Sequence, residues 1–136
     1  MTSHMSDDRL AIVRRFFQQY FDGHVDEAMK LLGPNVEYRV TGRSTLSGTF
    51  VGPEAVTNHL RKFLELTETP VDVLQWEDWL VGSVYVGCVL RVELQRPGRR
   101  QEFRLILLVQ VGVDDKISAV EVFSSNPEAL ERFFAT

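Results

Sequence analysis

Two charged residues in the second half of the chain have the types and the spacing for acid–base chemistry. Arg91 and Glu93 are two positions apart in a segment rich in apolar residues, so on a β-strand their side chains share one face. A buried carboxylate beside an arginine can serve as a general base, because burial raises its pKa and the cation lowers it again. If the protein is an enzyme, we expect Glu93 to be the base and Arg91 to hold its ionisation state.

The turn at Pro97-Gly98 decides which way this pair faces. A two-residue loop places Arg91 opposite Arg104 and Glu93 opposite Glu102, and the charges then lie outside a nearly unbroken apolar surface. A three-residue loop turns both charges to the other side of the sheet. The sequence leaves both arrangements open and slightly favours the outer one.

Three other polar residues could reach a pocket. Tyr38 shares one side of a strand with Val36 and Val40, and is either a donor that polarises a substrate oxygen or a core tyrosine with a satisfied hydroxyl. His59 is either an acid–base group or an edge histidine, and Tyr20 suits the core or the rim. The expected ligand-binding residues are Tyr20, His59, Cys88, Leu107 and Val122.

Several other kinds of chemistry and partner are disfavoured. Cys88, the single cysteine, excludes an internal disulfide and is most simply a buried small hydrophobe. No nucleophile motif, metal-ligand spacing or phosphate-binding glycine loop is present, so we expect no cofactor and no metal. The net charge of −4 argues against a nucleic-acid partner, and no segment approaches the ~20 apolar residues of a membrane span. A polar N-terminus without a signal-peptide core favours a cytoplasmic location.

The periodicity of apolar residues predicts the elements that must position these groups. The 136 residues suit one domain over 9–136, after a disordered segment 1–8 whose first four residues resemble an expression remnant. Predicted helices span 9–21, 25–32 and 54–67, with a short one after Asn126-Pro127. Predicted strands span 36–40, 71–81, 84–95, 101–111 and 116–124, with a short arm at 46–51.

This order of elements predicts an α+β fold. A cone-shaped, curved antiparallel sheet wraps around the three helices of the N-terminal half, and a short C-terminal helix follows. The central stretch 38–60, with turns at Gly42 and Gly48 before a helix that starts at Gly52-Pro53, organises the fold. The mouth of the cone is the expected pocket, bounded by Tyr20, Tyr38 and His59 and sized for a small, mostly apolar ligand.

The same order, with specific residues, resembles the SnoaL-like branch of the nuclear transport factor 2-like superfamily over 9–134. The residues that carry the resemblance are Phe16 to Gly23, Val36-Glu37-Tyr38, Gly42, Leu46 to Gly52, Ala55-Val56 and Lys116-Ile117. The resemblance implies a cystatin-like cone, and the superfamily includes ketosteroid isomerases, polyketide cyclases and limonene epoxide hydrolases.

This sequence departs from the catalytic patterns of those enzymes. Tyr38 stands where ketosteroid isomerases carry their base. Arg91-Val92-Glu93 resembles the Arg-x-Asp of the epoxide hydrolases, and Val122 takes the place of their further aspartate, with Glu121 one residue away. Their Tyr-x-Asn aligns with Tyr38-Arg39-Val40, so only the tyrosine matches.

Three functions from different classes follow. A cofactor-free isomerase, cyclase or epoxide hydrolase predicts a carboxylate inside the cone with a raised pKa. A non-catalytic binding module for a small hydrophobic ligand predicts a cone lined only by apolar groups, tyrosine and histidine. A protein-interaction module, the least favoured, would use the outer sheet face. We also expect a homodimer through that face, because it carries apolar residues opposite the core: Tyr85, Val89, Ile106 and Leu108.

Overall fold

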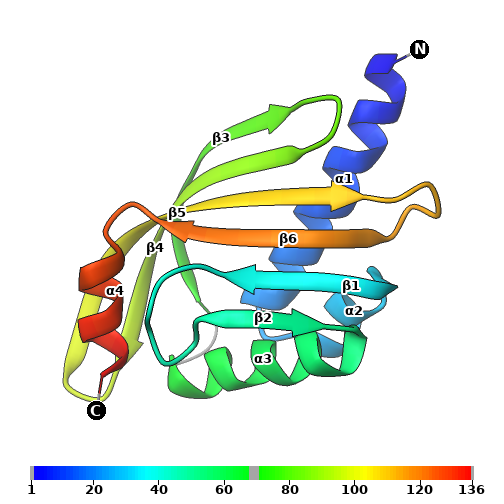
Figure 1. The fold of residues 1–136 in the computed structure, drawn as a ribbon. Coiled ribbons are helices and arrows are strands. Elements are labelled where there is room, and N and C mark those ends of the chain that lie inside the picture. The colour runs from blue at the N-terminus through cyan, green and yellow to red at the C-terminus, as the bar shows by residue number, and fades with distance from the viewer. Residues whose placement is uncertain (1, 68–70, 136) are drawn as a thin grey trace.

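The computed structural model of the protein describes residues 2–67 and 71–135 as four helices and six strands (Figure 1). The helices are α1 (Thr2–Phe21), α2 (Val25–Met29), α3 (Pro53–Leu66) and α4 (Pro127–Phe134). The strands are β1 (Leu32–Val40), β2 (Gly48–Val51), β3 (Asp72–Val81), β4 (Val86–Arg96), β5 (Arg99–Val111) and β6 (Ile117–Ser124). The α+β class, the curved sheet and the short C-terminal helix are confirmed.

All six strands form one open sheet in the order β2-β1-β6-β5-β4-β3. The prediction of a wholly antiparallel sheet is wrong at one place, because β1 and β6 pair in parallel. The strands β3 to β6 form an antiparallel meander, and its last strand, β6, runs beside β1 in the same direction. A parallel pair requires a long crossover connection, and the segment of the chain between β1 and β6, which includes α3, supplies it.

The turn between β4 and β5 has the two-residue loop. Arg96 pairs with Arg99 across Pro97-Gly98, and Gly98 has a φ of +76°, which glycine adopts without steric cost. The register then places Leu90 opposite Leu105 and Val92 opposite Phe103 on the concave face. These four side chains are buried, so the concave face of β4 and β5 is core.

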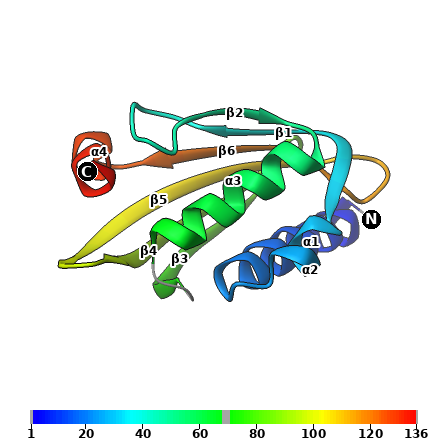
Figure 2. The ribbon, with the colours of Figure 1, turned by 90° about the horizontal axis from the view of Figure 1, so that it is seen from below.

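The helices lie against the concave face, as Figure 2 shows: α1, α2 and α3 are on one side of the sheet, and α4 lies at the end where β6 finishes. An apolar stripe on α1, with Val13, Phe16, Phe17 and Tyr20 buried, packs into the core. The N-terminus of α4 is capped by the Asn126 side chain, which accepts a hydrogen bond from the Ala129 N–H, and Pro127 occupies its first turn.

Two boundaries differ from the prediction. The helix α1 begins at Thr2, whereas the sequence predicted it from about Arg9 after disordered residues 1–8; neither Gly nor Pro interrupts this segment. Gly33-Pro34 was expected to follow a helix ending at Leu32, but α2 ends at Met29 and these residues belong to β1. A Cβ at Gly33 would lie 3.2 Å from the Ile117 carbonyl oxygen, so the glycine permits close approach to β6.

Candidate functional site

A partly enclosed cavity of about 50 Å³ lies between the concave face of the sheet and the helices. Its walls come from α1, β1, the connection between β1 and β2, α3, β4, β5, β6 and α4. Most lining side chains are apolar, including Phe17, Leu94, Leu107 and Phe134, all nearly inaccessible to solvent. A concave apolar cavity with a few convergent polar groups is the usual form of a small-molecule site.

Tyr20, Tyr38 and His59 line this cavity from three different elements. Their exposed fractions are 3%, 2% and 6%. Ring packing holds them: the His59 ring stacks on Phe50 with centroids 4.3 Å apart and lies 5.3 Å from the Tyr38 ring, while the Tyr20 ring is 5.8 Å from Phe63.

In the part of the chain that the structure describes, no hydrogen bond joins these three side chains to another residue, and the fully buried side-chain atom without a partner is Thr57 Oγ1 on α3. A fourth polar residue on the wall, Ser44, is already engaged: its Oγ lies 3.1 Å from Ser47 Oγ and accepts a hydrogen bond from the Leu46 N–H. Buried polar groups in proteins are nearly always hydrogen-bonded. The two phenol hydroxyls and the imidazole are therefore the groups left for a bound molecule.

The cavity wall is uncharged at neutral pH. Burial, with a smaller contribution from Lys62 on the same helix, lowers the pKa of His59 from 6.5 to about 4, so the imidazole is neutral. Burial raises the pKa of both Tyr20 and Tyr38, and the neighbouring Tyr38 raises that of Tyr20 further. Among the described lining residues there is no Asp, Glu, Lys or Arg. The site offers hydrogen bonds but no counter-ion.

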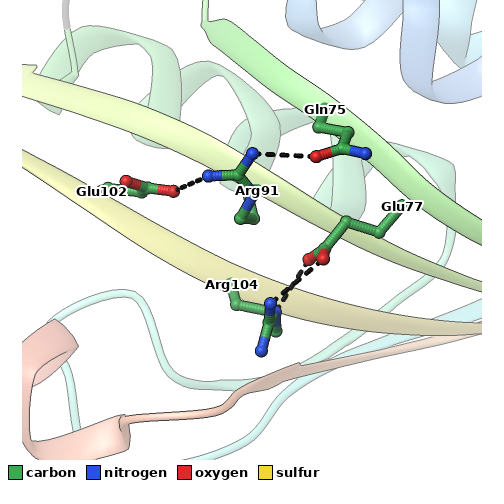
Figure 3. A network of polar contacts seen from close by, with 5 residues as sticks. All are labelled: Gln75, Glu77, Arg91, Glu102 and Arg104. Carbon is green, nitrogen blue, oxygen red and sulfur yellow. Dashed lines mark hydrogen bonds and ion pairs between the residues drawn. The ribbon is translucent and has the colours of Figure 1, made fainter.

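Arg91 and Glu93 lie on the opposite, convex face of the sheet, which is the arrangement that the sequence slightly favoured, and they do not line the cavity as the catalytic hypothesis required. The two-residue turn pairs Arg91 with Arg104 and Glu93 with Glu102. Figure 3 shows the resulting network, in which Arg91 donates to Glu102 and, over 2.8 Å, to Gln75 Oε1. The facing like charges are relieved by diagonal partners, since Arg104 binds Glu77 at 2.7 Å and Arg100 lies 3.4 Å from Glu93.

The comparisons with known proteins agree with this geometry. Residues 13–120 match the model of the SnoaL-like domain. The chain belongs to the SnoaL-like family. Uncharacterized protein Rv0034 of Mycobacterium tuberculosis is 32% identical over 137 residues, covering 96% of this chain and all of that protein.

Two solved structures illustrate the shared fold of this SnoaL-like domain. An NTF2-like protein from Burkholderia xenovorans LB400 superposes with a TM-score of 0.82 at 19% identity, over 95% of this chain and 97% of that one. RV0760c from Mycobacterium tuberculosis, solved in complex with estradiol-17beta-hemisuccinate, has a TM-score of 0.74 at 15% identity, over 85% and 92% of the two chains.

Most of the predicted lining residues of the SnoaL-like domain do border the cavity. Tyr20, Tyr38, His59, Leu107 and Val122 line it, whereas Cys88 does not. Cys88 faces the core between Trp79 and Leu107, and burial raises the pKa of its thiol to about 12, so it acts as a packed apolar group. The lining residues that the prediction missed include Ser44, Leu130 and Phe134; the apolar face of the C-terminal helix was the available signal for the last two.

A larger hollow of about 760 Å³ lies on the surface between α2 and α3. It is open, and two of the charged side chains that line it, Arg61 and Asp26, form an ion pair at 2.6 Å. We favour the smaller cavity as the site because it is lined mainly by buried apolar side chains and because Tyr20, Tyr38 and His59 converge on it. Among the described residues, no set of three or more His, Cys, Asp or Glu side chains could hold a metal ion. In the same part of the chain, no helix has the length and apolar character needed to cross a membrane.

Proposed function

We propose that this SnoaL-like domain binds a small, uncharged, mostly apolar molecule that carries one alcohol or carbonyl oxygen. The observation that carries the proposal is the wall of the cavity, where two tyrosines and a neutral histidine stand among apolar side chains and no charged residue is present among the described lining residues. An oxygen of the ligand would receive the hydrogen bonds that Tyr20, Tyr38 and His59 leave unmade, and the rest of the ligand would bury apolar surface.

The absence of charge on the described wall argues for an uncharged ligand. A carboxylate or an ammonium group moved from water into this cavity would lose its hydration and find no opposite charge. The same desolvation lowers the pKa of His59 and raises that of Tyr38, which are two signs of one low-polarity environment.

Binding is favoured over a proton-transfer reaction. A general base works best when its pKa lies near the working pH. The described wall has no carboxylate, and His59, with a pKa of about 4, is a weak base at neutral pH. A wall of apolar groups, tyrosine and histidine is expected for a protein that only binds its ligand. An isomerase, cyclase or epoxide hydrolase is expected to have a carboxylate inside the fold.

The fold relative RV0760c was solved with estradiol-17beta-hemisuccinate, which supports the use of this fold for organic ligands. The ligand of this chain must be smaller, or the cavity must widen to admit it. The cavity of about 50 Å³ is roughly a third of an engineered cavity of ~150 Å³ that admits benzene.

The test uses ligands of one shape and different charge, with binding followed by NMR chemical-shift titration. Cyclopentanol should bind, while cyclopentylammonium and cyclopentanecarboxylate should bind at least ~100-fold more weakly, because neither charge finds a partner. The double variant Tyr20→Phe/Tyr38→Phe keeps both rings and removes both hydroxyls. It should weaken cyclopentanol binding about five- to tenfold and leave cyclopentane binding unchanged.

Tyr85→Phe is the matched control, because this tyrosine is exposed and lies outside the cavity. It should leave binding of both cyclopentanol and cyclopentane as in the wild type. Equal binding of the charged and uncharged ligands would refute the proposal. Equal effects of the double variant on cyclopentanol and cyclopentane would also refute it.

A further inference from the structure

The helix α4 forms one wall of the cavity but is short. It has eight residues, and two of them, Leu130 and Phe134, line the cavity. The Phe134 ring lies 6.1 Å from Phe63 on α3, and the neighbouring Phe133 ring packs edge-on against Phe103 at 5.3 Å. A helix of two turns has little stability of its own. Its position therefore depends on contacts with the rest of the fold.

Two arginines hold the C-terminal end of α4. Arg96 and Arg99 flank the turn between β4 and β5, far from α4 in sequence. Arg96 Nη1 donates to the Phe133 carbonyl at 2.8 Å, and Arg99 Nη1 donates to the carbonyls of Phe133 and Ala135 at 3.0 and 2.9 Å. These contacts satisfy carbonyls that a helix end leaves without partners, and place positive charge at the negative end of the helix dipole.

The Arg96 guanidinium also lies 5.9 Å from the centre of the Phe134 ring. Thr45, in the connection between β1 and β2, adds a hydrogen bond from its Oγ1 to the Phe134 carbonyl at 3.3 Å. The end of the helix that carries Phe134 is thus tied both to the β4–β5 turn and to the β1–β2 connection. These ties fix where the Phe134 ring closes the cavity.

The seam between α4 and the β1–β2 connection is where a ligand would enter. Leu130 on α4 and Ser44 in the connection are partly exposed, although both line the cavity, whereas Tyr20, Tyr38 and Leu107 are buried. Because the cavity of about 50 Å³ is smaller than a benzene-sized ligand needs, a wall must move to admit one. Movement of α4 would widen the cavity at this seam.

We propose that Arg96 and Arg99 are positioning residues that hold α4 against the sheet, and thereby limit the size of the ligand and the rate at which it exchanges. The effect on ligand binding rests on the proposed function. The effect on the position of α4 rests only on the hydrogen bonds to the Phe133 and Ala135 carbonyls.

The variant Arg96→Gln/Arg99→Gln removes both charges, and Arg96→Lys/Arg99→Lys keeps them. Arg100→Gln is the matched control. Arg100 follows Arg99 on β5, but its side chain lies 3.4 Å from Glu93 on the convex face and not at α4. Hydrogen exchange of the amides of residues 130–134 reports the helix position without any ligand. In the glutamine variant these amides should exchange at least ~10-fold faster, with those of Leu105 and Leu107 unchanged.

Ligand size provides the second measurement. The glutamine variant should release cyclopentanol ~10-fold faster and should shift its preference toward cyclooctanol, while the lysine variant recovers part of the wild-type behaviour. Unchanged α4 amide exchange in a folded glutamine variant would overturn the inference, as would an equal effect of Arg100→Gln. If the wild type binds none of the alcohols, the proposed function fails, and faster α4 exchange still supports the positioning role.

Discussion

The buried imidazole of His59 should make folding stability depend on pH in a specific way. In the folded protein burial lowers the pKa of His59 from 6.5 to about 4. Between these two pH values the unfolded chain binds a proton at this histidine and the folded chain does not. The free energy of unfolding therefore falls as the pH is lowered through this range, and the contribution is fully present above about pH 6.5.

The magnitude follows from the difference between the two pKa values. One pKa unit corresponds to about 1.4 kcal/mol, so the fall from 6.5 to about 4 corresponds to about 3 kcal/mol of unfolding free energy lost at the acid end. His59 is 6% exposed, so little solvent screening reduces this figure. The neighbouring groups on β1 and α1, Tyr38 and Tyr20, are neutral throughout the range, because burial raises the pKa of both hydroxyls.

The assay is urea unfolding at several pH values from 7 to 4, followed by the fluorescence of Trp76 and Trp79 at one protein concentration. His59→Gln removes the titrating group and keeps a polar side chain. Titration of the carboxylates is common to both proteins, so the difference between their curves isolates His59. The advantage of the wild type should shrink by about 3 kcal/mol from pH 6.5 to 4. His24 is exposed, so His24→Gln is the control for the loss of a histidine. The reasoning would be refuted if the free energies of unfolding of the wild type and of His59→Gln ran parallel over this pH range.

Three further predictions follow from the placement of single side chains. Glu93→Gln should leave the affinity for cyclopentanol within about twofold of wild type, because Glu93 lies on the convex face; a tenfold loss by NMR titration would contradict this placement. We propose that the convex face pairs two copies of the chain through the half-buried Val89, Ile106 and Phe123, which lie side by side across β4, β5 and β6. Light scattering should then show a dimer for the wild type and a monomer for Ile106→Lys, whereas a wild-type monomer at micromolar concentration would exclude the pairing. Asn126→Ala removes the cap of α4 and should lower stability by about 1 kcal/mol in thermal unfolding; an unchanged melting temperature would mean that the cap is not made in solution.

Much of the fold was predictable from local patterns. Alternation along β4 and β5 predicted that Leu90, Val92, Leu105 and Leu107 share the core face, and the structure confirms it. One of the two loop lengths considered at Pro97-Gly98 is the observed one, and that length also predicted that Arg91 and Glu93 point outward. A one-residue difference in a turn reverses every side chain of the strand, so the sequence alone could not decide this point.

The features that were missed depend on contacts between distant segments. The parallel pairing of β1 with β6 joins residues some 80 positions apart, for example Tyr38 with Val120, and strand periodicity carries no information about it. Phe134 was recognised as apolar, but its place in the cavity wall depends on Arg96 and Arg99, which bind main-chain carbonyls rather than side chains. The pattern of side chains could not predict such bonds.

A crystal structure of the protein with cyclopentanol tests the central claim most directly. The ligand should lie between α1, α3, α4 and the concave strands, with its oxygen within about 3 Å of the Tyr20 or Tyr38 hydroxyl or of a His59 ring nitrogen. An alcohol bound in the open hollow between α2 and α3, with the partly enclosed cavity empty, would contradict the account. So would an alcohol in the partly enclosed cavity whose oxygen contacts none of these three side chains.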